Sequence, residues 1–383
     1  MNNLISYFKN RKKKLGKRTL PLHEPEINSG DKKEILKSLN SGYVSTVGRQ
    51  VEKFENEIKK VTKSKHVIST INGTSAIHIG LKIIGVNSND EVLLPSIGFV
   101  AAANAILYNN AFPHFVDSEK SHFGIDPEKL YQYLISNTFL KNGNCINKKT
   151  KRVIRAIIIV HVFGHPAKIS KIISIAKKFK IKVLEDAAEA LGSKYHGKHV
   201  GNFGDVGVLS FNGNKIITTG VGGVILCNNK NLAKKAKHIT TTSKKKHKWE
   251  YIHDSIGFNY RLASLNAALG ISQIRKLKGY ILKKHILFKK IKRLILKSDE
   301  VYLLDQPKFC KSNFWLHTLI LKKPSFKKRN SILNKFHKEN ILARPVWRPL
   351  HKLSFLKKYP KMNLVNTKEI ENKIINIPSS YYL

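Results

Sequence analysis

Short apolar segments alternate with amphipathic ones through the middle of the chain, and this alternation constrains the fold more than any other feature. The apolar segments predict strands at 66–70, 91–95, 113–117, 153–163, 180–186, 205–211 and 222–228. Helical spacing of apolar residues separates several of these strands, at 74–85, 100–109 and 167–179. Alternation of this kind predicts an α/β fold with a mostly parallel central sheet and helices on both faces.

The segments on either side of this alternation predict the domain organisation. Two helices are expected at 31–42 and 51–63, and the polar stretch 141–153 is typical of a surface loop. From about residue 255 the pattern turns helical, over 263–296, and short strands are expected at 314–323 and 341–347. We therefore expect three parts, which are a flexible basic tail over 1–20, a large α/β domain over 21–250 and a smaller C-terminal α+β domain over 251–383.

Two residues at the ends of the predicted strands carry the chemistry. Asp186 ends the apolar strand 180–186, and Lys215 follows the strand 205–211 in a turn rich in Gly and Thr. Ligands in such sheets bind beyond the carboxyl ends of the strands, so both side chains are expected to face one site. Pyridoxal phosphate requires this pair, because a lysine bonds its aldehyde and a carboxylate keeps its pyridine nitrogen protonated. The sequence therefore predicts pyridoxal 5'-phosphate as the cofactor.

The stretch Asn72-Gly73-Thr74-Ser75 lies between a predicted strand and a predicted helix. The first N–H groups of such a helix bind a phosphate, aided by the positive end of the helix dipole. Thr and Ser are also ordinary helix N-caps, which is the alternative for this motif. Ser210 is expected to add a hydroxyl to the same phosphate, and Phe99 either stacks on the pyridine ring or belongs to the core.

Composition limits the other classes of function. The chain has 70 Lys and Arg against 25 Asp and Glu, and its net charge of +45 attracts phosphates, nucleic acid and acidic membranes. The lysines are spread between apolar positions of predicted helices, which favours solvated helix faces over a binding patch. No nucleic-acid partner is expected, and a basic nucleic-acid-binding protein remains the alternative from another class.

The cysteines, histidines and apolar runs bear on the cellular compartment and on metal binding. Cys145, Cys227 and Cys310 lie far apart, which argues against a disulfide framework or a zinc cluster and favours a reducing cytoplasm. No metal site is expected from the four histidines between 161 and 199, which lack the spacing of metal ligands. No apolar run approaches the ~20 residues of a membrane span, and residues 1–18 do not have the order of a signal peptide.

A series of motifs resembles one known family. The motifs, in chain order, are PLHEP, GYVSTVGRQVEKFE, INGTSAIHIGLKIIGV, FVAAANAI, HVFGHP, VLEDAAEALGS, GNFGDVGVLSFNGNKIITTG, GFNYRLASLNAALG, SNFWLHTLIL and ARPVWRPLH. From about residue 20 to about 375 the chain resembles the DegT/StrS nucleotide-sugar aminotransferases. It is most similar to the branch that aminates C4 of UDP-4-keto-6-deoxy-N-acetylhexosamines for bacillosamine and legionaminic acid. The resemblance implies a type I-like aminotransferase fold, L-glutamate as amino donor and a role in cell-surface glycan biosynthesis.

The resemblance also implies roles for individual residues. Lys215 and Asp186 match the catalytic lysine and its partner acid, and Asn259 matches an asparagine that reaches the phosphate of the neighbouring subunit, which implies a homodimer with shared sites. Glu189 matches a residue near the ring hydroxyl. The other matched positions are Gly73, Thr74, Ser75 and Ser210 for the phosphate, Phe99 for the ring, and Arg344, Trp347 and His351 for the sugar.

The chain departs from the family pattern at a few positions. Gly98 and Ala102 stand where relatives usually have hydroxyl residues, Val221 stands where Gly or Glu is common, and Tyr43 stands where Trp is expected. Within the family, a sugar dehydratase would carry His in place of Lys215, so the lysine argues against that activity. A 3-keto-sugar aminotransferase keeps every cofactor residue and stays open as an alternative.

Overall fold

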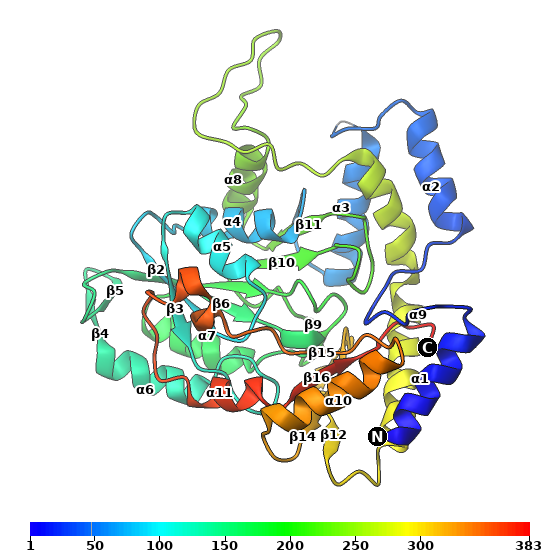
Figure 1. The fold of residues 1–383 in the computed structure, drawn as a ribbon. Coiled ribbons are helices and arrows are strands. Elements are labelled where there is room, and N and C mark those ends of the chain that lie inside the picture. Colours follow the sequence, from blue (N-terminus) through cyan, green and yellow to red (C-terminus); the bar gives the residue numbers. More distant parts are fainter. Residues whose placement is uncertain (47) are drawn as a thin grey trace.

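The computed structural model describes residues 1–46 and 48–383, and its centre is a seven-stranded sheet (Figure 1). The strands lie in the order β1-β11-β10-β7-β6-β2-β3. Their bounds are β1 His66–Thr70, β2 Glu91–Pro95, β3 Phe112–Val116, β6 Ile154–Val160, β7 Lys182–Asp186, β10 Val206–Ser210 and β11 Gly223–Cys227. All seven strands expected from the sequence are present, and the predicted α/β class is confirmed.

The direction of the strands brings the predicted site residues to one edge. β10, β7, β6, β2 and β3 pair in parallel, whereas β11 runs antiparallel to both β1 and β10. In the β6–β7 ladder Val160 lies opposite Asp186, and in the β7–β10 ladder Asp186 lies opposite Val208. The carboxyl ends of these neighbouring strands therefore meet at the same edge of the sheet.

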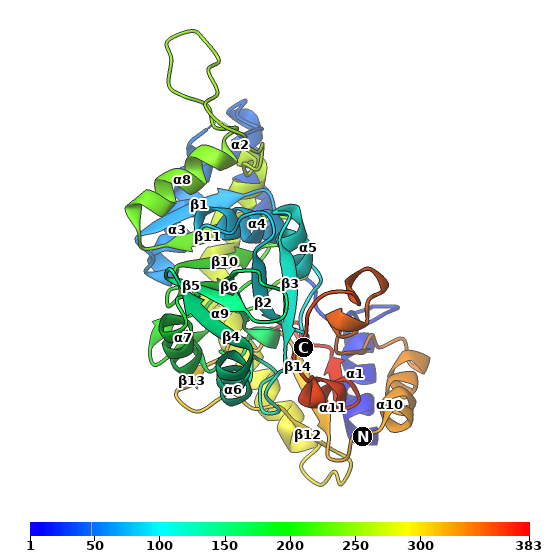
Figure 2. The same cartoon turned by 90° about the vertical axis from the view of Figure 1, so that its left-hand side faces the viewer.

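Helices cover both faces of the sheet, as the alternation predicts (Figures 1 and 2). One face packs against α4 (Gly73–Ile83), α5 (Ala101–Tyr108) and α8 (Lys230–Thr240). The other face packs against α3 (Arg49–Thr62) and the first half of α9 (Ser264–Leu294), and against α6 (Pro127–Asn137) and α7 (Ile169–Lys178). Neighbouring residues of one strand serve opposite faces, because Ile158 joins the first core and Ile157 the core under α6 and α7.

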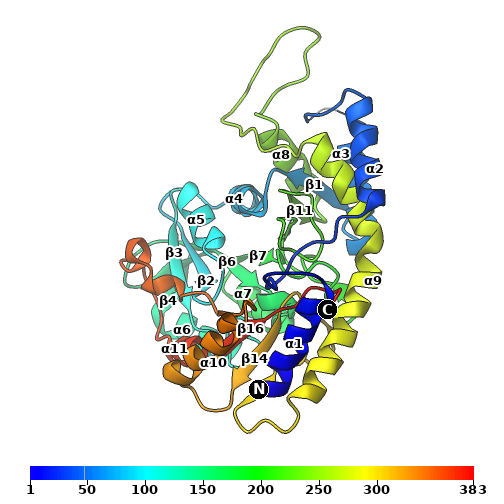
Figure 3. The same ribbon diagram turned by 45° about the vertical axis from the view of Figure 1, so that its right-hand side comes forward.

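A second sheet forms a smaller unit beside the first. Its strands lie in the order β12-β14-β16-β15 and are antiparallel, with bounds β12 Val301–Leu303, β14 His317–Leu321, β15 Arg344–Pro345 and β16 Ile374–Ile377. α10 (Phe326–Lys338) and the end of α9 share its core, and α11 (Val365–Glu371) follows near the C-terminus. The 31-residue α9 thus runs from the large sheet to the small one (Figure 3). The boundaries at 21–250 and 251–383 remain a prediction.

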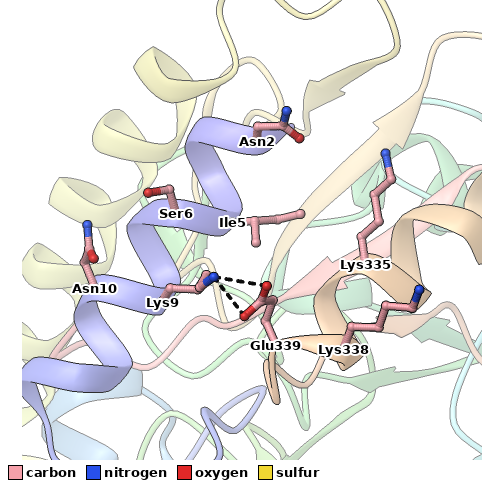
Figure 4. Close-up of a pocket in the computed structure, with 8 residues that line it drawn as sticks. All are labelled: Asn2, Ile5, Ser6, Lys9, Asn10, Lys335, Lys338 and Glu339. Carbon is pink, nitrogen blue, oxygen red and sulfur yellow. Dashed lines mark hydrogen bonds and ion pairs between the residues drawn. The ribbon is translucent and has the colours of Figure 1, made fainter.

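The N-terminal segment differs from the expected tail. Residues Asn2–Lys14 form α1, and its Leu4 and Phe8 are completely buried against the small unit, where the Phe8 ring lies 6.3 Å from that of Phe336. Figure 4 shows α1 beside α10, with Lys9 paired to Glu339 at 3.1 Å. Residues four apart share one face of a helix, so the apolar pair can pack while the lysines stay in solvent.

The stretch 141–153 is also more regular than the loop expected from its polarity. β4 (Thr138–Lys141) and β5 (Asn144–Asn147) form an antiparallel hairpin. Asn142 and Gly143 connect them with φ of 48° and 72°. Asn-Gly favours positive φ at both positions and is a strong signal for a two-residue hairpin turn. The dipeptide therefore predicts the hairpin, although the polarity of the whole stretch favours a loop.

A long loop between α8 and α9, residues 241–263, projects from the large unit (Figures 1–3). Bridges between Thr241 and Asn259 and between Lys244 and His253 hold its two arms together. Trp249, Tyr251 and Ile256 in this loop are 71%, 79% and 80% exposed. Among the described residues, no helix is long and apolar enough to cross a membrane.

The packing of α1 gives a stability prediction. Phe8→Ala removes a completely buried aromatic side chain and should lower the free energy of unfolding by about 3–5 kcal/mol. Leu282→Ala, at a 62% exposed position of α9, should change it by less than about 0.5 kcal/mol. Chemical denaturation of the three proteins measures both. Equal stabilities of wild type and Phe8→Ala would mean that α1 does not contribute to the folded unit.

Candidate active site

A cavity of about 360 Å³ lies at the carboxyl ends of the parallel strands. Strand ends and turns supply Asp186, Ser210 and Lys215, and the start of α4 supplies Gly73 and Thr74. The small unit closes the cavity with Trp315 and Trp347. Most of the predicted cofactor residues therefore line one cavity, and these are Gly73, Thr74, Phe99, Asp186, Glu189, Ser210 and Lys215.

The start of α4 forms a narrow cradle. Asn72 is the N-cap, and its side chain accepts a hydrogen bond of 2.8 Å from the N–H of Ser75. A Cβ placed on Gly73 would lie 2.9 Å from Cβ of Ser210, so the backbone there approaches its neighbour as closely as glycine allows. The N–H groups of Gly73 and Thr74 stand at the positive end of the helix, beside the hydroxyl-bearing Ser210.

Lys215 has two partners in the cavity. Its Nζ lies 3.6 Å from Oε1 of Glu189 and 4.2 Å from the centroid of the Trp315 ring. The side chain of Lys215 is 13% exposed and that of Glu189 is 7% exposed, so both groups are largely withdrawn from water. The amine is therefore held at the cavity wall, close to both a carboxyl group and an indole ring.

Burial perturbs both carboxyl groups of the cavity. Desolvation raises the pKa of Glu189 to about 7, although Lys215 and the N–H of Phe163, which donates to Oε2 at 2.8 Å, oppose the rise. Desolvation also raises the pKa of Asp186, and the N–H of Ala188, 3.1 Å from its Oδ1, opposes that rise. Buried carboxyl groups with raised pKa beside a lysine are typical of catalytic sites.

The other residues predicted for the site lie elsewhere. Ser75 is buried inside the α4 start, and exposed Asn259 lies at the base of the projecting loop. Arg344 is exposed on β15, and Nδ1 of His351 is 2.7 Å from the buried hydroxyl of Ser96. Of the three residues predicted for the sugar, the cavity includes Trp347 alone. The substrate roles of Arg344 and His351 remain predictions.

Several cavity residues escaped the sequence analysis. Trp315 lies in a segment that reads as a strand of the small unit, and its approach to Lys215 depends on how the two units pack. Asn212 and Asn214 come shortly before Lys215 in the sequence, and this position could have identified them as site residues. Val221, one of the departures from the family pattern, lines the cavity, and a Cβ on Gly98 would meet Val160 at 3.9 Å, so a side chain would fit there.

The residues present fit pyridoxal phosphate. The cradle at Gly73 suits its phosphate, because free helix N–H groups and the Ser210 hydroxyl stand together there. Asp186 suits the pyridine nitrogen, and Lys215 suits the aldehyde. These three groups are the donor set that the cofactor needs, and they line the same cavity.

Solved structures with the same fold define the class of protein. Helicobacter pylori PseC, described as an aminotransferase involved in the biosynthesis of pseudoaminic acid, matches with a TM-score of 0.86 at 26% identity, over 96% of this chain and 95% of that one. Spr1654 from Streptococcus pneumoniae, solved in its PLP form, matches with a TM-score of 0.84 at 20% identity, over 95% and 94%. The chain has the fold of the pyridoxal phosphate-dependent aminotransferases.

Sequence relatives then give the family. A model of the DegT/DnrJ/EryC1/StrS aminotransferase family matches residues 25–383, and the chain belongs to this family. The GDP-perosamine synthase of Escherichia coli O157:H7 is 32% identical over 94% of this chain and 93% of its own length. The UDP-4-amino-4,6-dideoxy-N-acetyl-beta-L-altrosamine transaminase of Campylobacter jejuni is 28% identical over 92% and 90%. The protein is a PLP-dependent sugar aminotransferase, as the sequence predicts.

The raised pKa of Glu189 predicts a pH dependence of stability. The folded state holds this proton up to a pH of about 7, whereas the unfolded state releases it near 4.5. The contribution of Glu189 therefore destabilises the fold as pH rises between these values, by an amount on the order of 3 kcal/mol. The variant Glu189→Gln has no carboxyl group to ionise. In cofactor-free protein its free energy of unfolding, relative to that of wild type, should therefore increase as pH rises from 4.5 to about 7. Denaturation at pH 4.5 to 8 measures it.

Glu52→Gln serves as the control for that series, because Glu52 is exposed on α3. Its pH profile should run parallel to that of wild type. Parallel profiles for Glu189→Gln and wild type would instead contradict the burial of a protonated carboxyl group beside Lys215.

Proposed function

We propose that the protein transfers an amino group from L-glutamate to C4 of a UDP-linked 4-keto-6-deoxy-N-acetylhexosamine. The observation that carries this is one cavity in which Lys215, Asp186 and the phosphate cradle at Gly73 stand together. The name of the Campylobacter relative, a transaminase of a UDP-linked 4-amino-4,6-dideoxy sugar, supports C4 and the nucleotide. The motifs of the same branch in this sequence support the same substrate.

In this proposal each residue has a defined task. Bound pyridoxal phosphate supplies an electron-withdrawing ring that stabilises negative charge on the substrate carbon next to the reacting nitrogen. Asp186 holds the proton on the ring nitrogen, and the Gly73–Ser210 cradle holds the phosphate. Lys215 would hold the aldehyde, and, once free, its amine would act as the base and acid that move a proton at the substrate carbon. The same amine would serve the keto sugar, with the proton moving in the opposite direction.

The buried carboxyl of Glu189 stands 3.6 Å from Nζ of Lys215. Its pKa of about 7 lets it exist in both protonation states near neutral pH. Glu189 therefore balances the charge of the amine as Lys215 gains and loses its proton. In relatives the matching residue approaches the ring hydroxyl of the cofactor. The Glu189 side chain is flexible enough to contact either that hydroxyl or the amine of Lys215.

The proposal includes a homodimer with shared sites. Asn259 lies outside the cavity of its own chain, at the base of a loop that exposes Trp249 and Tyr251 at its tip and Ile256 in one arm. Large exposed apolar side chains on a projecting segment favour contact with another chain. This placement supports the expectation that Asn259 serves the phosphate of the neighbouring subunit.

A GDP-linked sugar is the second candidate substrate. The GDP-perosamine synthase of Escherichia coli O157:H7, at 32% identity, supports it. A 3-keto sugar is the third candidate, because amination at C3 would use the same cofactor residues. The three candidates differ in the nucleotide or in the carbon that receives nitrogen, and none changes the roles of Lys215 and Asp186.

The role of Lys215 gives a spectroscopic prediction. Wild-type protein with added pyridoxal phosphate should show a visible absorption band of the bound aldehyde, and L-glutamate should bleach it as the cofactor takes the amino group. Lys215→Ala lacks the bonding amine and should show neither the lysine-bound band nor turnover. Absorption spectra before and after glutamate measure both.

Lys194→Ala is a matched control, since Lys194 is an exposed lysine on β8 (Lys194–Tyr195). It should keep the band and the bleaching. A protein that takes up no cofactor, or whose band survives loss of Lys215, would contradict the proposal. If such a protein also bound DNA in a salt-dependent way, the nucleic-acid alternative would replace it.

The substrate is tested with defined keto sugars. Cofactor-loaded protein is first bleached with L-glutamate and freed of it. It is then offered a UDP-linked 4-keto-6-deoxy-N-acetylhexosamine, a GDP-linked 4-keto-6-deoxyhexose and a 3-keto analogue, one at a time. We expect return of the visible band with the UDP-linked 4-keto sugar, and an amine on C4 of the product by NMR. Faster return with the GDP-linked sugar would assign that nucleotide, and an amine on C3 would overturn the C4 assignment.

A further inference from the structure

Three hydrogen bonds hold Trp315 in place. Its indole N–H donates to the carbonyl of Asn214 at 2.8 Å, and its backbone N–H donates to Oδ1 of Asn313 at 2.9 Å. Its carbonyl accepts from Nζ of Lys284 at 3.0 Å. The residue is 4% exposed, so these bonds fix both its backbone and the plane of its ring.

Lys284, which donates to the carbonyl of Trp315, is unusual because it is a buried lysine. Lys284 is completely buried on α9, and its Nζ also donates to the carbonyl of Ser379 at 2.5 Å. Burial lowers the pKa of Lys284 well below its usual value. A buried lysine is retained at a cost in desolvation, and here it ties Trp315 and the C-terminal segment to the long helix.

The fixed ring lies against the reacting amine. Nζ of Lys215 is 4.2 Å from the ring centroid of Trp315, within the range of a cation–π contact, and it is 3.6 Å from Oε1 of Glu189. The carbonyl that receives the indole N–H belongs to Asn214, the residue just before Lys215. One side chain therefore touches the lysine at its charged end and fixes the backbone from which it starts.

We propose that Trp315 is a positioning residue for Lys215, and that its ring is the resting place of the amine whenever the amine is not bonded to the cofactor. This rests on the proposed function, in which Lys215 is displaced and then moves a proton. A freed lysine side chain has many rotamers, and most of them carry its amine away from the reacting carbons. The ring and Glu189 keep it within reach.

The test compares Trp315→Leu, which loses the aromatic ring, with Trp315→Phe, which keeps a smaller aromatic ring and loses the indole N–H. Tyr131→Leu is the control, because Nζ of Lys178 lies 4.8 Å from the Tyr131 ring on the surface formed by α6 and α7. It removes a lysine–aromatic contact far from the cavity. Thermal unfolding confirms that each variant is folded before it is compared.

The first readout uses cofactor-free protein and does not depend on catalysis. Acetic anhydride acylates the amine of Lys215, and mass spectrometry follows the rate. Loss of a cation–π contact and of the ring that covers the amine should speed acylation of Lys215 about fivefold in Trp315→Leu, and less than about twofold in Trp315→Phe. Tyr131→Leu should leave the rate for Lys215 unchanged.

The second readout uses cofactor-loaded protein in a single turnover with L-glutamate. Trp315→Leu should bleach the visible band about tenfold more slowly at saturating glutamate, with the glutamate concentration for half-maximal rate unchanged. Trp315→Phe should retain most of the rate. This split separates positioning of the amine from binding of the donor.

Each result bears on the proposal. If Trp315→Leu is acylated and bleached at the wild-type rates, the proposal is overturned. If its maximal rate is unchanged but the glutamate concentration for half-maximal rate rises, Trp315 belongs to substrate binding instead. Survival of the visible band in Lys215→Ala would sink the proposed function, while faster acylation in Trp315→Leu would still establish the contact between ring and amine.

Discussion

The parallel pairing of β6, β7 and β10 is the constraint on which the rest of the structure depends. It sets Val160, Asp186 and Val208 side by side, and the turn after β10 can then present Lys215 to the carboxylate of Asp186. A shift of one residue in register would turn Asp186 to the other face of the sheet. The helices, the cradle at α4 and the contacts from the small unit are arranged around that edge.

The sequence predicts this part of the molecule well, for a physical reason. Buried parallel strands are continuous apolar runs, and the carboxyl groups of Glu185 and Asp186 stand out because they end such a run. Resemblance to the family adds the expected roles of Lys215 and Glu189. At Asn72–Thr74 local pattern and tertiary packing agree, because the predicted helix start also lines the cavity. Ser75, predicted for the same cradle, is instead buried in the helix.

The parts that escaped prediction depend on contacts between distant segments. Leu4 and Phe8 show helical spacing in a basic segment, but only the surface offered by α9 and α10 makes that helix stable. Trp315 reads as a strand residue, and its meeting with Lys215 follows from the packing of the small unit on the large one. The hairpin at 138–147 had a local signal in Asn142-Gly143, and the polarity around it masked that signal.

The length of α9 links the two units mechanically. At 1.5 Å per residue its 31 residues make a rod of about 46 Å, which begins in the core of the large sheet and ends in that of the small one. A tilt of about 5° about its first turn displaces its last turn by about 4 Å. Lys284 joins this helix to Trp315, so a tilt of α9 would carry Trp315 with it and would change the distance between its ring and the amine of Lys215.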